Sequence, residues 1–471
     1  MSVVFLLYLL VTQITSVYAN ELEEIREIPP PPEYTSAAVV LMDAATGLVL
    51  YESEANTQMY PASVTKIMTA LIVLEHATDL TERIEFCDYA VWSIPRNSSH
   101  IYMDVGETLS IYEALYALML ESANEVSVAL AIHIAGSVEE FADLMNRRAA
   151  SLGANNTHFV NPSGLPARGH VTTAYDMALI MREAVNNPIF TNIISARRFD
   201  IPPTERQTEI RHLLNSNRQI HPGTFYNESV VGGKTGWTTA AGNTLVTYAN
   251  HEGRRLIVSI LKGEGTGAFT DTSSLLEYGF ALPMENVTVF DSEAYSIAVP
   301  VFQEINGNPT EIGRVRLMSD NDLNFELPLD WSNSWLRYEL STPEILAPPV
   351  LLGTTVGRVA VYVQNIRVGD VPLTTRDAVF AYTPPVYDDN TEYAHSEPVR
   401  AAYKNVNQIF TGYLSFLNNE YVLTLAVPLA ISLATLIFAI VATLTRHRRR
   451  LRRILRSRRA RFARYPHYRY K

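Results

Sequence analysis

The hydrophobic and polar positions change period several times along the chain, and the first regular patterns follow residue 36. The run SAAVVLMDAATGLVLYE (36–52) has two apolar stretches around a turn with Asp43 and Gly47, which predicts a β-hairpin. PASVTKIMTALIVLEH (61–76) then has helical spacing, and residues 111–135 predict two apolar helices interrupted near Ser122–Asn124.

The pattern from residue 141 to residue 282 predicts two further helices, then strands, then a last helix. The helices at 141–153 and 172–185 have a C-terminal Gly153 and an N-capping Thr173 as their end signals. Three consecutive strands are predicted in SVVGGKTGW, GNTLVTYAN and RRLIVSILKG, and a helix in TSSLLEYGFAL. We therefore expect one α/β domain over 34–282, with helices packed on a largely antiparallel sheet.

The texture changes again after residue 287. Short alternating runs separated by Gly, Pro, Asn and Asp fill 287–382 and predict a small all-β second domain. Residues 20–33 are acidic and proline-rich and are expected to be a linker, as is 384–420. No internal repeat is evident.

Two segments indicate a membrane setting. Residues 1–19 contain an apolar run that ends Val-Tyr-Ala, which predicts a signal peptide, although its positive n-region is missing and an uncleaved anchor is the alternative. Residues 421–445 are uncharged and long enough to cross a bilayer as a transmembrane helix. The tail at 446–471 holds 12 arginines and no acid, so the positive-inside rule places it in the cytoplasm and the rest outside the cell membrane.

The charge balance excludes some partners. The net charge is −11, and all 49 acidic residues lie outside the basic tail. A body this acidic would repel the phosphates of a nucleic acid, so no nucleic-acid partner is expected. The single cysteine, Cys87, cannot form an intrachain disulfide. A cysteine nucleophile is one interpretation, but with no partner pattern around it we favour a small side chain without a chemical role.

Lysine is rare, and one of the lysines follows a serine by one helical turn. Five of the 38 basic residues are lysines, so arginine serves wherever only charge is needed. Lysine can lose its proton when it is desolvated, whereas arginine cannot act as a base. Ser63 and Lys66 would share a face of the predicted helix and could touch. Alone, the pair is equally well explained by a helix cap and a solvated charge.

The chain offers an internal control for this pair. A second Ser-x-x-Lys, Ser259 and Lys262, lies in the strand-like run RRLIVSILKG. Residues three apart on a strand point to opposite faces, so this serine and lysine cannot meet.

Two further polar fragments accompany Ser63 and Lys66. Ser122-Ala-Asn124 interrupts the apolar helices, and Lys234-Thr235-Gly236 lies on a strand directly after two glycines. Glycines at that place permit close approach of another backbone or a ligand. Taken singly, the fragments would be a polar loop and a bulge.

The order Ser-x-x-Lys, Ser-x-Asn, Lys-Thr-Gly resembles that of penicillin-binding proteins and serine β-lactamases. The chain is most similar to low-molecular-mass D-alanyl-D-alanine carboxypeptidases. The resemblance is carried by PASVTKIMTA, MLESANEVSVALA, FVNPSGL, HVTTAYDMALI and VVGGKTGWTTAAGNTLV. It covers 36–282 strongly and 287–382 more weakly, and it implies a β-lactamase/transpeptidase-like catalytic domain with a β-rich second domain.

The resemblance also implies roles for individual residues. Ser63 would be the nucleophile and neutral Lys66 its base, with Ser122 relaying a proton to the leaving D-alanine. The residues expected to bind substrate are Asn124, Lys234, Thr235, Gly236 and Trp237. The substrate would be the peptidoglycan pentapeptide, β-lactam antibiotics would inhibit, and neither a metal nor a cofactor is expected.

Two departures from the family and two alternatives remain. The loop LKGEGTGAFTDTSS lacks the arginine that often helps bind the substrate carboxylate, and 421–445 is a fuller anchor than the usual amphipathic helix. A β-lactamase is one alternative, but no Glu-x-x-Leu-Asn stretch lies between Ser122 and Lys234. The other alternative is a catalytically weak penicillin-binding scaffold, against which the three intact motifs argue.

Overall fold

The computed structural model describes residues 27–383. The expected signal peptide, the transmembrane segment at 421–445, the basic tail and the linker at 384–420 lie outside these residues. Within the described range, no helix combines the length and the apolar character that a membrane span requires. The boundaries expected for the two domains stay predictions.

The first sheet of the chain has five antiparallel strands in the order β2-β1-β9-β8-β7. Its strands are β1 (Ala38–Asp43), β2 (Val49–Ser53), β7 (Val230–Thr238), β8 (Gly242–His251) and β9 (Arg254–Gly263). Strand β1 lies between two hydrophobic cores, because successive side chains on a strand point to opposite faces of the sheet. Ala38, Val40 and Met42 pack with helices on one face, and Val39 and Leu41 pack on the face that α9 (Gly267–Ala281) covers.

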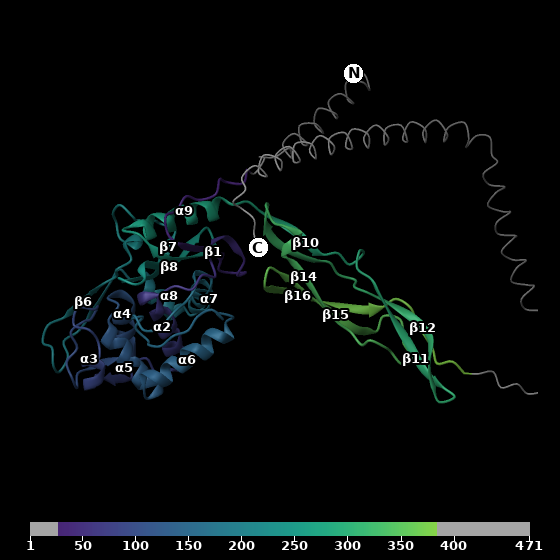
Figure 1. Cartoon of the computed structure of the whole chain (residues 1–471), viewed down its shortest axis with the longest axis horizontal. Coiled ribbons are helices and arrows are strands. Elements are labelled where there is room, and N and C mark those ends of the chain that lie inside the picture. The colour runs from purple at the N-terminus through teal and green to yellow at the C-terminus, as the bar shows by residue number, and fades with distance from the viewer. Residues whose placement is uncertain (1–26, 384–471) are drawn as a thin grey trace, which may run out of the picture. The chain divides into compact units, whose positions relative to one another are not determined.

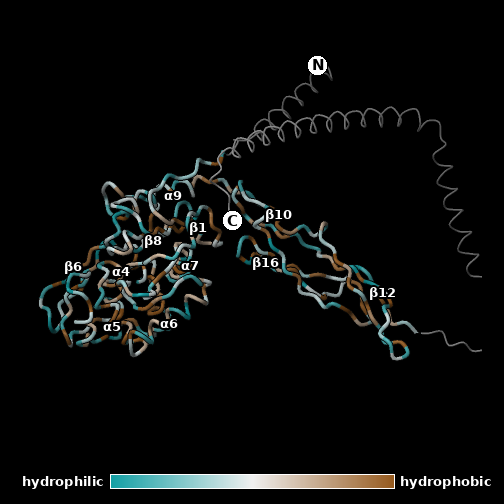
Figure 2. The backbone as a smooth tube through the Cα atoms, in the orientation of Figure 1, coloured by the Kyte–Doolittle hydropathy of each residue, from teal (hydrophilic) through white to brown (hydrophobic). Residues whose placement is uncertain are grey.

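The other α-helices and two 3₁₀ helices lie between β2 and β7 in the sequence (Figure 1). They are η1 (Ala62–Thr65), α2 (Lys66–His76), α3 (Asp88–Trp92), α4 (Ile111–Leu120), α5 (Asn124–Ala135), α6 (Val138–Ser151), α7 (Ala174–Ala184), α8 (Pro188–Ser195) and η2 (Arg218–Ile220). Hydrophobic segments run through α5 and β8, as the hydropathy colouring shows (Figure 2). The antiparallel sheet with helices packed on it is the mixed α/β arrangement that the sequence predicts.

Local polar contacts explain where several of these elements begin. Oδ1 of Asp43 accepts from the backbone N–H of Thr46 and closes the turn of the first hairpin. Ser110 and Glu113 form a complete capping box at the start of α4. Thr173 caps α7, as expected, by accepting from the N–H of Asp176 at 3.0 Å.

The regular elements within residues 284–375 are strands and one short 3₁₀ turn, η3 (Asn333–Trp335). The strands β10 (Met284–Phe290) and β13 (Leu323–Pro328) pair, and five others form a sheet in the order β11-β12-β16-β15-β14. These five are β11 (Ile297–Ile305), β12 (Asn308–Met318), β14 (Leu336–Ser341), β15 (Thr355–Val363) and β16 (Ile366–Thr375). The pairings between these strands are antiparallel.

Two small two-stranded sheets, β3–β4 and β5–β6, were not predicted from the sequence. Their strands are β3 (Arg83–Glu85), β4 (Thr108–Ser110), β5 (Arg198–Ile201) and β6 (Arg211–Leu214). A strand of three or four residues is too short to show a period of two. The last helix also begins at Gly267, five residues before the predicted start at 272.

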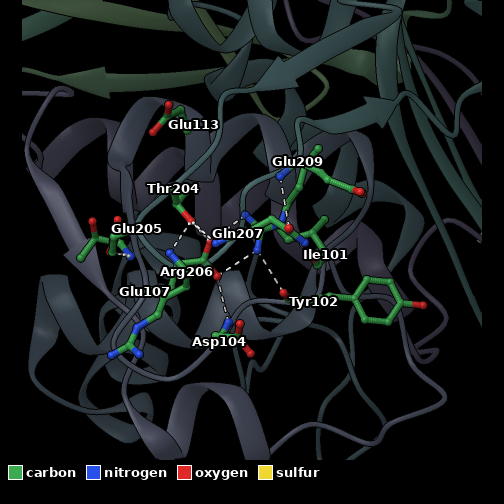
Figure 3. A network of polar contacts seen from close by, with 12 residues as sticks. Ile101, Tyr102, Asp104, Glu107, Glu113, Thr204, Glu205, Arg206, Gln207 and Glu209 are labelled. Atoms are coloured by element: carbon green, nitrogen blue, oxygen red, sulfur yellow. Dashed lines mark hydrogen bonds and ion pairs between the residues drawn. The ribbon is translucent and has the colours of Figure 1, made fainter.

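A buried ion pair joins β6 to the segment that precedes β4. Nη1 and Nη2 of Arg211 donate to the two carboxylate oxygens of Glu107 at 2.7 and 2.9 Å, and the side chains are only 9% and 0% exposed. Arg211 also donates to the carbonyls of Ile101 and Tyr102, at 3.0 and 3.1 Å. Figure 3 shows the polar network around Glu107, with the ring of Tyr102 pointing away from it.

We expect Arg211→Met to lower the free energy of unfolding by about 3–5 kcal/mol, because it leaves the Glu107 carboxylate buried without its partner. Urea unfolding followed by circular dichroism measures the change. Arg198→Met is the matched control, since Arg198 pairs with Asp200 at the exposed surface and should unfold like the wild type. Equal unfolding midpoints for the two variants would contradict the structural role of the buried pair.

Candidate active site

Ser63 lies in η1, and the α-helix α2 begins only at Lys66. The expected α-helical start at Ser63 is therefore a 3₁₀ turn, in which the N–H of Lys66 donates to the carbonyl of Ser63. Ala62 has a φ of 51°, a strained value for a residue other than glycine. Thr244 Oγ1 of β8 donates to the Pro61 carbonyl at 2.8 Å and ties this turn to the sheet.

The amine of Lys66 is buried and has three oxygen neighbours. Nζ lies 3.2 Å from Oγ of Ser63, 2.7 Å from Oδ1 of Asn124 and 2.6 Å from the carbonyl oxygen of Ser163. The side chain is 0% exposed. The amide oxygen and the carbonyl can only accept hydrogen bonds.

These neighbours match the needs of a neutral amine. A neutral amine has two N–H groups, which Asn124 and Ser163 would accept, and one lone pair, which is left for the hydroxyl of Ser63. Burial lowers the pKa of Lys66 well below its ordinary value, the charge of Lys234 lowers it further, and the charge of Glu125 opposes both. The surroundings thus favour an uncharged Lys66 that can accept a proton from Ser63.

Ser122 occupies the turn between α4 and α5, with a φ of 61°. Its Oγ is buried and makes no hydrogen bond. Asn124 begins α5, and its N–H donates to the carbonyl of Ser99 at 2.9 Å. A buried hydroxyl without a partner beside Asn124 is free to bond a substrate group or to carry a proton.

Lys234 and Thr235 lie in β7. Lys234 is 1% exposed, and its Nζ donates to the carbonyl of Thr235 at 2.9 Å. Burial lowers the pKa of Lys234 to about 7, against the charge of Glu121, which raises it. The hydroxyl of Thr235 lies 2.7 Å from that of Ser216, a residue that no sequence motif identifies.

Gly236 brings the backbone of β7 against the nucleophile's own turn. A Cβ on Gly236 would lie 2.7 Å from the backbone nitrogen of Ser63 and 2.5 Å from Thr244 Oγ1, so only glycine fits without displacement. Trp237 follows, with 64% of its surface exposed. Ser63 and the Lys-Thr-Gly strand are therefore direct neighbours.

Like Ser216, the turn at 161–165 belongs to the site, although the sequence analysis gave it no role. Oδ1 of Asn161 accepts from the N–H groups of Ser163 and Gly164, at 3.2 and 2.8 Å, and fixes the turn. Gly164 has a φ of 84°, and a Cβ there would lie 1.9 Å from the carbonyl oxygen of Ala62. This close packing places the carbonyl oxygen of Ser163 within hydrogen-bond distance of Lys66 Nζ.

His170 contacts the same region through Val160 and Thr65. Its Nδ1 accepts from the N–H of Val160 at 3.0 Å, which leaves Nε2 protonated and donating to Thr65 Oγ1, also at 3.0 Å. Burial, with smaller contributions from His158 and Lys66, lowers the pKa of His170 to about 4. The ring is therefore neutral near pH 7 and orients Thr65 instead of carrying charge.

The structure thus gathers the three motifs around Lys66. The control pair behaves differently, because Ser259 is buried while Lys262 is exposed on the same strand. The connection from β9 to α9 contains no arginine. The guanidinium of Arg218, in another segment, stacks on Phe225, with its Cζ 4.3 Å from the ring centre. Among the described residues, no group of three or more His, Cys, Asp and Glu side chains could hold a metal ion.

Known proteins with a similar fold or sequence indicate the class of this protein. The fold is similar to penicillin binding protein 5 from Haemophilus influenzae, at 24% identity and a TM-score of 0.54 over 75% of this chain and 100% of that one. D-alanyl-D-alanine carboxypeptidase DacF of Bacillus subtilis is 34% identical over 50% of this chain and 58% of its own length. D-alanyl-D-alanine carboxypeptidase DacC of Escherichia coli is 29% identical over 74% of this chain and 85% of its own length.

The family model of the D-alanyl-D-alanine carboxypeptidases, Peptidase_S11, matches residues 25–265, just over half of the chain. The chain belongs to this family and is a hydrolase of the carboxypeptidase type. The identification from the order of its motifs is confirmed, and the β-lactamase alternative is not favoured.

Proposed function

We propose that this protein removes the terminal D-alanine from peptidoglycan stem peptides through an acyl-enzyme on Ser63, and that penicillin acylates the same serine. The observation that carries the proposal is the setting of Lys66, whose two acceptor neighbours leave one lone pair for the hydroxyl of Ser63. The family membership of the chain supports the substrate class.

The first chemical step is attack on the substrate carbonyl. The proton of the Ser63 hydroxyl passes to Nζ of Lys66, and Oγ bonds to the carbonyl carbon of the penultimate D-alanine. Backbone N–H groups of Ser63 and Trp237 are assigned to the oxyanion, since β7 lies against the turn of Ser63; each such donor contributes roughly 3 kcal/mol in comparable sites. The C–N bond then breaks, and Ser122 relays the proton held by Lys66 to the leaving amine.

Substrate binding falls to the other motif residues. Lys234 and Thr235 take the terminal carboxylate, and Asn124 holds the amide of the penultimate residue as well as Lys66. Water then hydrolyses the ester on Ser63 and regenerates the enzyme. Lys66 takes one proton of this water as the water oxygen bonds to the ester carbonyl, and returns the proton to Oγ of Ser63 as the ester bond breaks.

The pH dependence of kcat/KM should show which lysine must be neutral and which charged. The rate rises with pH as Lys66 of the free enzyme loses its proton, and it falls as Lys234, with a pKa of about 7, loses the charge that binds the carboxylate. Lys234→Arg should move the falling limb to much higher pH, because arginine keeps its charge. Lys262→Arg is the control, and an unmoved falling limb in Lys234→Arg would refute the assignment.

The direct assay of the function is D-alanine release from diacetyl-Lys-D-Ala-D-Ala. The proposal predicts the release of one D-alanine for each peptide hydrolysed, and penicillin should block this release. Rapid multiple turnover of nitrocefin without D-alanine release would instead favour the β-lactamase alternative. Penicillin binding without turnover of either compound would favour the scaffold.

The location proposed for this activity is the outer face of the cell membrane. The uncharged segment at 421–445 and the arginine-rich tail support a single-pass anchor with an external body. We expect the full chain to remain with carbonate-washed membranes and a chain that ends at residue 420 to be released. If both distribute alike, 421–445 is not the anchor.

A further inference from the structure

Five large apolar side chains of the β-rich region are exposed and have no role in the mechanism above. They are Ile345, Leu351, Leu352, Phe380 and Tyr382, and their exposed fractions run from 49% for Tyr382 to 67% for Leu352 and Phe380. We call these five residues the apolar patch. A single exposed apolar residue is ordinary, whereas several that lie together mark a surface that contacts a partner or a membrane.

Backbone hydrogen bonds hold the two segments of the apolar patch side by side. The N–H of Val350 donates to the carbonyl of Val379 at 2.8 Å, and the N–H of Val379 donates back to the carbonyl of Val350 at 2.9 Å. The side chain of Gln303 binds both the N–H and the carbonyl of Tyr382, at 2.7 and 3.1 Å. These backbone groups therefore already have partners, which a surface must have before it can leave water.

The two segments also lack charge, although the body of the protein is acidic. Residues 345–357 and 378–383 contain no Asp, Glu, Lys or Arg. The charged residues directly next to these segments are Glu344, Arg358 and Asp377. Because burying an ion is costly and burying an apolar group is favourable, an uncharged face of this kind suits an apolar partner better than a charged one.

The chain runs from the apolar patch to the proposed membrane anchor, and the inference rests on that proposed location. Tyr382 lies at the end of the described residues, and 38 residues separate it from the uncharged segment at 421–445. Even when fully extended, 38 residues reach no further than about 130 Å. An anchored chain therefore keeps the patch at a high local concentration beside lipid, whereas a second copy has to diffuse to it.

We propose that the apolar patch binds the surface of the lipid bilayer to which the chain is anchored. Leu351, Leu352 and Phe380 enter the boundary between headgroups and acyl chains, and Tyr382 keeps its hydroxyl among the headgroups. Since the patch carries no charge, the contact needs no anionic lipid and is insensitive to salt. It holds the β-rich region against the membrane by one face and so limits the orientations that the catalytic domain can take.

A fluorescent probe on the full chain tests this contact. In a Cys87→Ser background, Leu352→Cys carries the only probe, and the chain is reconstituted into phosphatidylcholine vesicles that are recovered by flotation. Spin-labelled lipid should quench this probe roughly twofold or more, because the side chain lies among the lipid headgroups. Leu340→Cys is the matched control, an exposed leucine on β14 at the edge of the sheet opposite β11, and its probe should stay unquenched.

A charge placed in the apolar patch should remove the contact. Phe380→Asp should lower the quenching of the probe at Leu352 to the level of the control, because a carboxylate is costly to bury in lipid. Leu340→Asp makes a similar change outside the patch and should leave the quenching as it is. Both variants should release D-alanine at the wild-type rate, since neither residue belongs to the active site.

Equal quenching of the two probes, or wild-type quenching in Phe380→Asp, would overturn the lipid contact. A probe at Leu352 that is shielded only when several chains share a vesicle, without quenching by lipid, would identify a second copy as the partner and would also overturn it. A chain that does not float with the vesicles would overturn the proposed location. Vesicles that show the quenching but release no D-alanine would overturn the proposed function alone.

Discussion

Ser63→Ala is expected to lower kcat for D-alanine release by roughly four orders of magnitude or more. The substitution removes the hydroxyl oxygen that lies 3.2 Å from the amine of Lys66 and that we assign to the attack on the substrate. Release of D-alanine from diacetyl-Lys-D-Ala-D-Ala measures the effect, and thermal unfolding checks that the variant is folded.

The chain supplies its own control for this experiment. Ser259 belongs to the second Ser-x-x-Lys sequence, and its buried Oγ has no hydrogen-bond partner. Ser259→Ala should therefore retain full activity. A Ser63→Ala enzyme that works at more than a few per cent of the wild-type rate would remove Ser63 from the mechanism.

Lys66→Arg is the second large effect, with an expected loss of about a thousandfold in the rate of acylation. Arginine can still donate to Asn124 and Ser163, but it cannot lose a proton near neutral pH and so cannot accept the proton of Ser63. The acylation rate with a fluorescent penicillin, measured by rapid quench, reports this step alone.

Lys262→Arg makes the same chemical change at an exposed strand position and should acylate at the wild-type rate. If Lys66→Arg also acylates normally, Lys66 serves only as a hydrogen-bond donor, and another group must take the proton.

The fold was predictable where apolar residues recur over long segments. The hairpin at 36–52, the helices around residues 66, 115 and 180 and the three consecutive strands after 229 all have such patterns. The short two-stranded sheets β3–β4 and β5–β6 depend instead on tertiary contacts, such as the bond between Arg211 and Glu107, which are 104 residues apart. Local sequence carries little trace of such a pair.

The site was predictable to the extent that its side chains form motifs. Ser163 contributes a backbone carbonyl, which any residue could supply, and only the turn chemistry of Asn-Pro-Ser-Gly could have indicated its position. Ser216 meets Thr235 from a distant segment, and His170 acts through Thr65, so neither belongs to a local pattern. These three complete the surroundings of Lys66 and Thr235 through the fold alone.

The most direct test of the central claim is the mass of the peptide that contains Ser63 after reaction with penicillin G. The intact protein is incubated with the drug, quenched in acid, digested, and sequenced by tandem mass spectrometry. Acyl transfer to Ser63 predicts one adduct per chain, located on Ser63, and no adduct in Ser63→Ala. An adduct on any other residue, or a penicillin complex with no covalent mass, would contradict the account.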